Sequence, residues 1–161
     1  PYAPVHGLGH AFGQMISFAG IVFNGVFDKF PGARFGFMEA GSGWLMTCIE
    51  RFSGSYASHI QYDPNRRFFD IKKGERVQDY IQRHIEAGRV FVGVEGDEPT
   101  LPYAIDMVGH KPFIYSSDFP HEVNNETCKE EISELKDNPA ISDDAKDAIL
   151  QGNAKAFYRV N

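Results

Sequence analysis

The chain has 161 residues, of which 42% are hydrophobic and 24% charged, a composition typical of one globular domain. Its 22 acidic residues outnumber its 16 lysines and arginines, and the formal net charge of −6 argues against general nucleic-acid binding. No apolar run approaches the roughly 18 residues of a transmembrane helix, and two distant cysteines make no disulfide framework. We therefore expect a reduced, cytoplasmic protein that binds neither nucleic acid nor membrane.

The first half of the chain predicts two helices on either side of a strand. Residues 11–28 are apolar on nearly all sides, which predicts a helix buried on most of its surface. Residues 33–39 follow a Pro-Gly turn and alternate partly, which predicts a strand that ends at Glu39. Residues 41–52 predict a turn and a helix, and the polar, irregular residues 53–74 predict a long loop.

The second half of the chain alternates helical periodicity with short apolar runs. Helices are predicted at 75–87, 97–109, 126–137, 142–151 and 154–158. Apolar runs at 89–94 and 112–117 predict two further strands, and the second is too continuously apolar to be half exposed. Strands separated by helices pair in parallel through right-handed crossovers, so the predicted fold class is α/β.

A carboxylate stands at the end of each predicted strand: Glu39, Glu95 and Asp118. In parallel α/β folds, ligands bind outside the carboxyl ends of the strands. Asp118 is therefore either a ligand of a divalent metal or a turn cap, because Asp-x-Pro favours turns. Glu39 is a base, a metal ligand, a salt-bridge partner or a helix cap. Perturbed carboxylates concentrate at functional sites but also occur in structural networks.

Histidines flank these carboxylates in the sequence. His121 follows Asp118 by three residues, and we consider it a ligand, an acid or base, a partner of Asp118, or a surface histidine. His6 and His10 have i, i+4 spacing, which would place both on one face of a helix. The glycines in this segment argue against a helix, so we expect His10 in a loop near the helix start.

Two other motifs have structural interpretations. Gly-Ser-Gly at 41–43 is weak evidence for phosphate binding, and we expect a turn with close packing. Asp97 and Glu98 are typical of a helix N-terminus, so only Glu95 in that acidic cluster remains a site candidate.

Four segments together resemble the amidohydrolase-related family, which includes the aminocarboxymuconate-semialdehyde decarboxylase-like enzymes. They are HAFGQM, GIVFNGVFDKFPGARFGFMEAGSGW, YSSDFPHE and ILQGNAKAFYRV, in that order along the chain. The resemblance implies a (β/α)8 barrel and a divalent metal, usually zinc, that acts in hydrolysis or decarboxylation of small carboxylated, often aromatic, substrates. Asp118 matches the aspartate that ends the last barrel strand and binds the metal or orients its water. His121 matches a frequent neighbour.

The chain departs from the family pattern at two points. It has no HxH pair, and it carries Glu39 where the decarboxylases have a catalytic histidine, so hydrolase and carboxy-lyase both stay open. A typical barrel needs about 250 residues. We therefore expect residues 1–161 to be one partial domain of about three βα units, without the first half of the barrel and inactive alone. It would be unstable, associate with itself, or pair with another chain that supplies the missing half. The alternative is a non-catalytic α/β fragment or interaction module.

Overall fold

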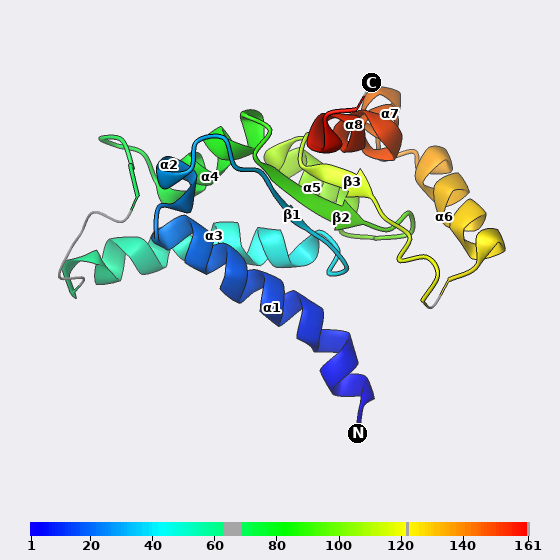
Figure 1. The fold of residues 1–161 in the computed structure, drawn as a ribbon, viewed down its shortest axis with the longest axis horizontal. Helices are drawn as coiled ribbons and strands as arrows, with labels where there is room; N and C mark the ends of the chain where they lie inside the picture. The colour runs from blue at the N-terminus through cyan, green and yellow to red at the C-terminus, as the bar shows by residue number, and fades with distance from the viewer. Residues whose placement is uncertain (63–68, 122, 161) are drawn as a thin grey trace.

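The computed structural model of the protein describes residues 1–62, 69–121 and 123–160. Its centre is one parallel sheet of three strands in the order β1-β2-β3 (Figure 1). The strands are Phe35–Phe37 (β1), Val90–Val94 (β2) and Phe113–Tyr115 (β3). All three carboxyl ends point to the same edge of the sheet because both pairings are parallel. The predicted α/β class and parallel pairing are confirmed, whereas closure into a barrel stays a prediction.

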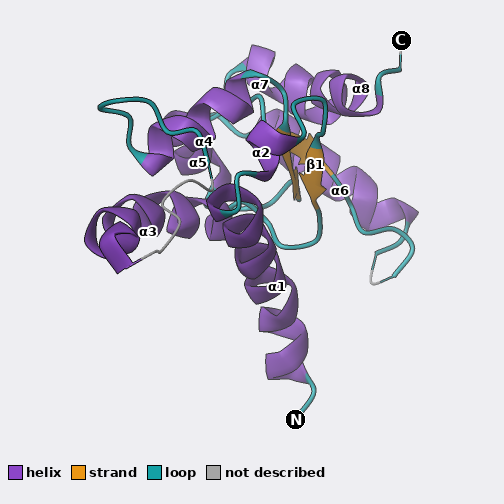
Figure 2. Ribbon diagram, turned by 60° about the vertical axis from the view of Figure 1, so that its left-hand side comes forward, coloured by secondary structure: helices purple, strands orange, loops and turns teal. Residues whose placement is uncertain are grey.

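Helices surround this sheet (Figure 2). Most of them match the predicted ranges within a few residues, a normal uncertainty for helix ends. They are α1 (Ala3–Phe23), α2 (Val26–Lys29), α3 (Gly43–His59), α4 (Val77–Glu86), α5 (Leu101–Val108), α6 (Asn125–Asp137), α7 (Asp143–Asp147) and α8 (Asn153–Tyr158), with a 3-10 turn at Ile60–Tyr62 and a π-helical segment at Ala148–Gly152. Within the described ranges, none of these helices is both long and apolar enough to span a bilayer.

The hydrophobic core lies between the sheet and helices α1, α3, α4 and α5. Phe18 of α1 is fully buried, and its ring meets Phe37 and Trp44 edge-on at centroid distances of 5.4 and 5.5 Å. Aromatic rings prefer such edge-to-face packing over a face-to-face sandwich. The core therefore anchors the C-terminal half of α1 directly against β1 and the start of α3.

Helix α8 lies at the opposite end of the strands from their carboxyl ends. Asn153 at its first turn donates from Nδ2 to the carbonyl oxygens of His110 and Phe113, both at 2.8 Å. Arg34, just before β1, donates to the carbonyl of Ala156. These contacts join α8 to the amino ends of β1 and β3, which leaves the carboxyl edge of the sheet to other segments.

Helix α1 differs from its prediction in three ways. It begins at Ala3, so Gly7 and Gly9 lie within it; a glycine costs a helix only about 1 kcal/mol relative to alanine. It ends at Phe23, because Gly25 has a left-handed backbone (φ 63°) that separates α1 from α2. It is not buried on most sides, since Phe12 is 54% exposed. The N-terminal half of α1 projects from the body of the molecule (Figures 1 and 2).

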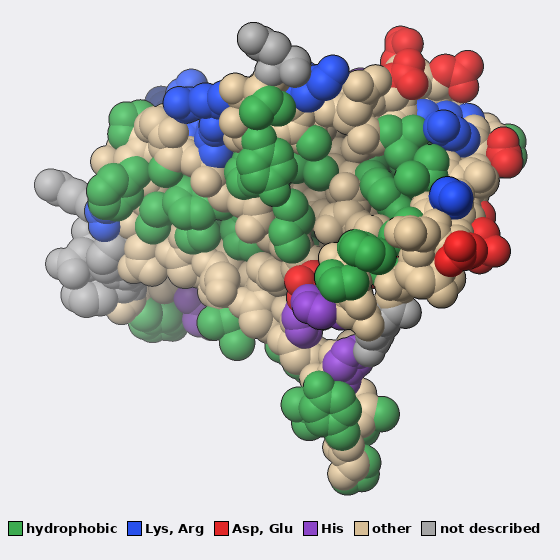
Figure 3. Space-filling view, turned by 45° about the vertical axis from the view of Figure 1, so that its right-hand side comes forward, with side chains coloured by type: hydrophobic (Ala, Val, Ile, Leu, Met, Phe, Trp, Pro, Cys, Tyr) green, Lys and Arg blue, Asp and Glu red, His purple; other side chains and the backbone are tan. Residues whose placement is uncertain are grey.

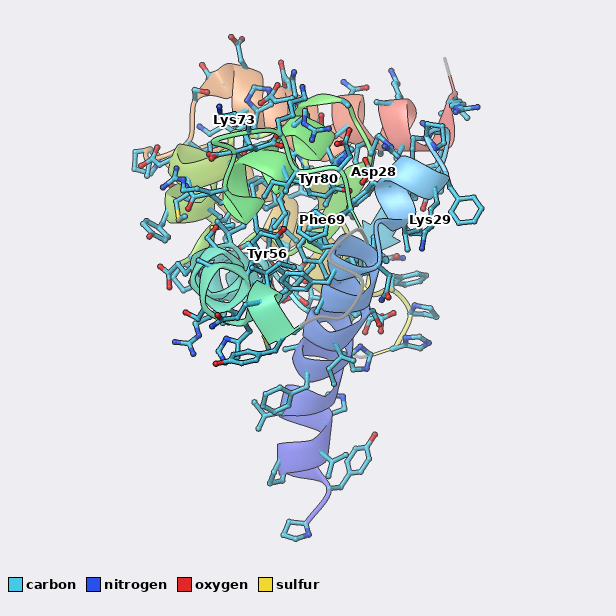
Figure 4. The ribbon with its side chains drawn as sticks, turned by 90° about the vertical axis from the view of Figure 1, so that its left-hand side faces the viewer. Asp28, Lys29, Tyr56, Phe69, Lys73 and Tyr80 are labelled. Carbon is cyan, nitrogen blue, oxygen red and sulfur yellow. The ribbon has the colours of Figure 1, made fainter. Side chains whose placement is uncertain are left out.

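Helix α3 continues to His59, seven residues beyond its predicted end at residue 52. Aromatic contacts explain the extension, because Tyr56 of α3 packs against Phe69, and Phe69 packs against Tyr80 of α4. Tyr80 also donates from its hydroxyl to Asp28 Oδ2 at 2.8 Å (Figure 4 labels these side chains). The prediction of a loop from residue 53 is therefore wrong for its first part, and residues 63–68 of that loop lie outside the described ranges.

His84 of α4 is a buried histidine that packs against the ring of Tyr80. It is 4% exposed, stacks on Phe27 at 4.5 Å, and accepts a hydrogen bond at Nδ1 from Arg89. Its Nε2 then carries the proton and has no partner among the described residues. Burial first, and the positive charges of Arg89 and Arg83 second, lower the pKa of His84 to about 4.

This histidine predicts a loss of stability in mild acid. The unfolded chain protonates it below about pH 6.5, whereas the folded chain resists protonation until about pH 4, so the unfolded state binds more protons. Between about pH 7.5 and about pH 5 we expect the free energy of unfolding to fall by about 2 kcal/mol from this group alone. Urea unfolding at both pH values measures it. Parallel pH dependence in wild type and His84→Gln would contradict the assignment.

Candidate active site

A cavity of about 640 Å³ opens at the carboxyl edge of the sheet. It brings together every site residue that the sequence predicts: Glu39, Glu95, Asp118 and His121. Figure 3 shows histidine and acidic side chains next to one another where the projecting helix leaves the body of the molecule. Its remaining lining residues are Tyr2, His6, Gly7, His10 and Ala11 of the N-terminal segment, Ala40–Gly43 after β1, and Glu98 and Thr100 after β2.

Asp118 and His121 form a pair after β3. Asp118 has a left-handed backbone (φ 57°), a conformation that aspartate tolerates better than most residues. The turn closes through a hydrogen bond from His121 N to Asp118 O at 3.0 Å, and Nδ1 of His121 lies 3.0 Å from Asp118 Oδ1. An ionised carboxylate only accepts, so Nδ1 carries the hydrogen. The side chain of Asp118 is 30% exposed and that of His121 is 72% exposed, so both can be reached from solvent.

Glu39, which follows β1, contacts His10, a residue that the sequence predicts in a loop. Its backbone is also left-handed (φ 63°), and its Oε2 lies 3.0 Å from Nδ1 of His10. The prediction that His10 lies in a loop is wrong, because it belongs to α1. The i, i+4 spacing of His6 and His10 correctly indicates that both residues lie on one face of a helix, and both line the cavity.

Glu39, Asp118 and His121 could hold a metal ion. Each offers one ligand atom, and these atoms lie within 4.8 Å of one another. Two carboxylates and an imidazole match the ligand preferences of borderline divalent cations such as Zn²⁺. This donor set therefore fits a divalent ion, although it contains fewer histidines than the family pattern.

Glu95 lines the cavity but lies outside that group of three among the described residues. Desolvation is the first cause that raises its pKa above the usual range of a glutamate, and the negative charges of Glu98, Glu131, Asp97 and Asp118 add to it. The structure therefore places Glu95 in an acidic environment that favours its protonated form.

The prediction that Glu98 lies in the first turn of a helix is wrong, because α5 begins at Leu101. Glu98 accepts from the backbone N–H and the hydroxyl of Ser42 at 2.9 and 2.8 Å, and from the backbone N–H of Glu95 at 2.9 Å. A Cβ added at Gly41 (φ 62°) would lie 3.1 Å from its carboxylate. The turn with close packing predicted for residues 41–43 is confirmed. No sequence pattern pairs Ser42 with Glu98, because they lie 56 positions apart.

Removal of the Glu98 carboxylate should loosen the rim of the cavity. We expect Glu98→Ala to lower the free energy of unfolding by about 1–3 kcal/mol, since it leaves two backbone N–H groups without their acceptor. Asp97→Ala is the matched control, because this neighbouring acid is exposed, and should stay within about 0.5 kcal/mol of wild type. Equal losses in the two variants, measured by chemical denaturation, would refute this role.

Comparison with known proteins identifies the family. Residues 3–160 match the family model described as Amidohydrolase. No curated protein matches the chain. The match extends over nearly the whole sequence and agrees with the placement of acidic and histidine side chains at the carboxyl edge of the sheet. The chain therefore belongs to the amidohydrolase family, whose members are usually metal-dependent hydrolases.

Proposed function

We propose that this chain carries part of the active site of a metal-dependent hydrolase that acts on a small carboxylated or aromatic substrate. One observation carries the proposal: Glu39, Asp118 and His121 come from two strand ends far apart in sequence and meet within 4.8 Å in one cavity. Carboxyl ends of parallel strands are the usual position of such sites. We further propose zinc as the ion, since the donors are carboxylate and imidazole.

The three residues have distinct chemical capacities. A bound divalent ion would polarise a substrate carbonyl and lower the pKa of a bound water. Asp118 and Glu39 can accept a proton from an attacking water, because both are carboxylates at the cavity wall. His121 holds a hydrogen on Nδ1 towards Asp118, so this pair can receive and return a proton during a reaction.

Hydrolysis is favoured over decarboxylation by the identity of residue 39. A decarboxylase needs an acid that protonates the carbon left by carbon dioxide. A histidine can supply this proton near neutral pH. Glu39 lies 3.0 Å from the imidazole of His10, a contact that suits the ionised, basic form of this carboxylate. Decarboxylation is the second candidate, since it is the other activity that the resemblance implies.

The apolar surface of α1 bears on whether the chain is part of a larger barrel. We propose that residues 1–161 are the C-terminal portion of a (β/α)8 barrel and that the first half of a barrel, or a second copy, packs against them. Val5, Leu8, Phe12 and Ile16 support this proposal, because they are each at least 52% exposed and form one apolar stripe along α1. A strictly monomeric chain in light scattering at high concentration would argue against self-association.

Metal titration of the full chain tests the proposal. We expect about one Zn²⁺ per chain by calorimetry. Once the missing half of the barrel is supplied, we expect hydrolysis of ester, lactone or amide bonds in a panel of small aryl substrates, with release of a carboxylic acid and an alcohol or amine. Release of carbon dioxide from aryl carboxylates, without hydrolysis, would favour the decarboxylase. Failure to bind zinc, manganese or another divalent ion would overturn the metal site and favour the non-catalytic module.

A further inference from the structure

Helix α1 holds the segment after β1 at two points on successive turns. Nδ1 of His10 lies 3.0 Å from Glu39 Oε2, and Nε2 of Gln14 donates to the carbonyl oxygen of Met38 at 2.8 Å. His10 and Gln14 have i, i+4 spacing, so they share one face of the helix. The helix therefore binds both the side chain of Glu39 and the backbone directly before it.

Glu39 needs this support because its conformation is costly. A non-glycine residue with a left-handed backbone is disfavoured by roughly 1–2 kcal/mol, and Glu39 has φ 63°. Its side chain is 41% exposed and has three rotatable bonds, so solvent alone would leave its carboxylate in many orientations. The contact with His10 selects one of these orientations.

The core in turn fixes the position of His10. Phe18 and Val22, on another face of the same helix, have no solvent exposure. A helix is stiff over this length, so the buried residues fix the azimuth at which His10 faces the cavity. The carboxylate of Glu39 has two oxygens and several lone pairs, so the contact of His10 with Oε2 leaves it able to bind an ion.

We infer that His10 is a positioning residue for Glu39: it orients the carboxylate for metal binding and does not itself bind the ion. This inference rests on the proposed metal-dependent function. Hydrogen-bond partners of metal ligands typically affect metal affinity by about 10- to 100-fold when removed. We expect an effect of that size from His10→Ala.

Calorimetric titration of the full chain with Zn²⁺ tests the inference. His10→Ala should bind zinc about 10- to 100-fold more weakly than wild type. His10→Asn should recover part of the loss, because its amide can donate to Glu39. His59→Ala is the matched control, since it removes an exposed histidine at the far end of α3, and should bind like wild type. Circular dichroism verifies that each variant is folded.

A double-mutant cycle separates positioning from direct binding. In the Glu39→Gln background, His10→Ala should cause no further loss, because its effect acts through the missing carboxylate. A full additional loss would mean that His10 binds zinc itself and would overturn the positioning role. Unchanged affinity in His10→Ala alone would overturn the inference and leave the metal site standing. Absence of zinc binding in wild type would overturn the proposed function, and the inference with it.

Discussion

Asp118→Asn should reduce zinc affinity by at least about 100-fold, since loss of an outer hydrogen-bond partner alone costs about 10- to 100-fold. Asparagine keeps the size of the side chain and tolerates the left-handed backbone at this position (φ 57°), where alanine would add strain. Its amide oxygen can also still accept from Nδ1 of His121. The substitution therefore removes the negative charge and leaves the turn after β3 intact.

Asp106→Asn is the matched control for this experiment. Asp106 is exposed on α5, does not line the cavity, and undergoes the same chemical change. It should bind zinc as wild type does. If Asp118→Asn and wild type hold equal amounts of metal by elemental analysis and calorimetry, Asp118 is not a ligand, and the site must be sought elsewhere.

Phe18→Ala should have the largest effect on stability, about 3–5 kcal/mol, the usual cost of emptying a buried aromatic site. Its ring is fully buried between β1, α3 and its own helix, so the neighbouring Phe37, Trp44 and Phe52 would line the cavity left behind. Such a loss is a large fraction of the stability of a typical domain. Thermal and urea unfolding followed by circular dichroism would measure it.

Phe12→Ala is the internal control, because it makes the same change on the same helix at a position that is 54% exposed. At low protein concentration it should change stability by no more than about 0.5 kcal/mol. Comparable losses in both variants would mean that α1 is packed differently. A loss at Phe12 that appears only at high concentration would instead support the proposed partner for the apolar stripe.

The strands and the acidic edge of the sheet were predictable because their signals are local. Apolar runs between helical segments place β1, β2 and β3 correctly, and parallel pairing then brings Glu39, Glu95 and Asp118 to one edge. The i, i+3 relation of Asp118 and His121 is local as well, and the structure places the two side chains in contact.

Long-range contacts decided what local patterns could not. The prediction for α1 was wrong at both ends. At its start, the cost of the glycines is smaller than the stabilisation from helical hydrogen bonds and from the burial of Phe18. At its end, the left-handed backbone of Gly25 terminates the helix. Helix α3 continues past its predicted end at residue 52 because Tyr56 packs against the ring of Phe69.

The α/β class and the carboxylates at the strand ends follow from residue types and their local spacing, and the family follows from the order of four segments along the chain. The contact of His10 with Glu39 and the hydrogen bonds from Ser42 to Glu98 arise only in the folded chain. These pairs are separated by tens of residues. Their contact energies exist only after the chain has folded, so no periodicity along the sequence could reveal them.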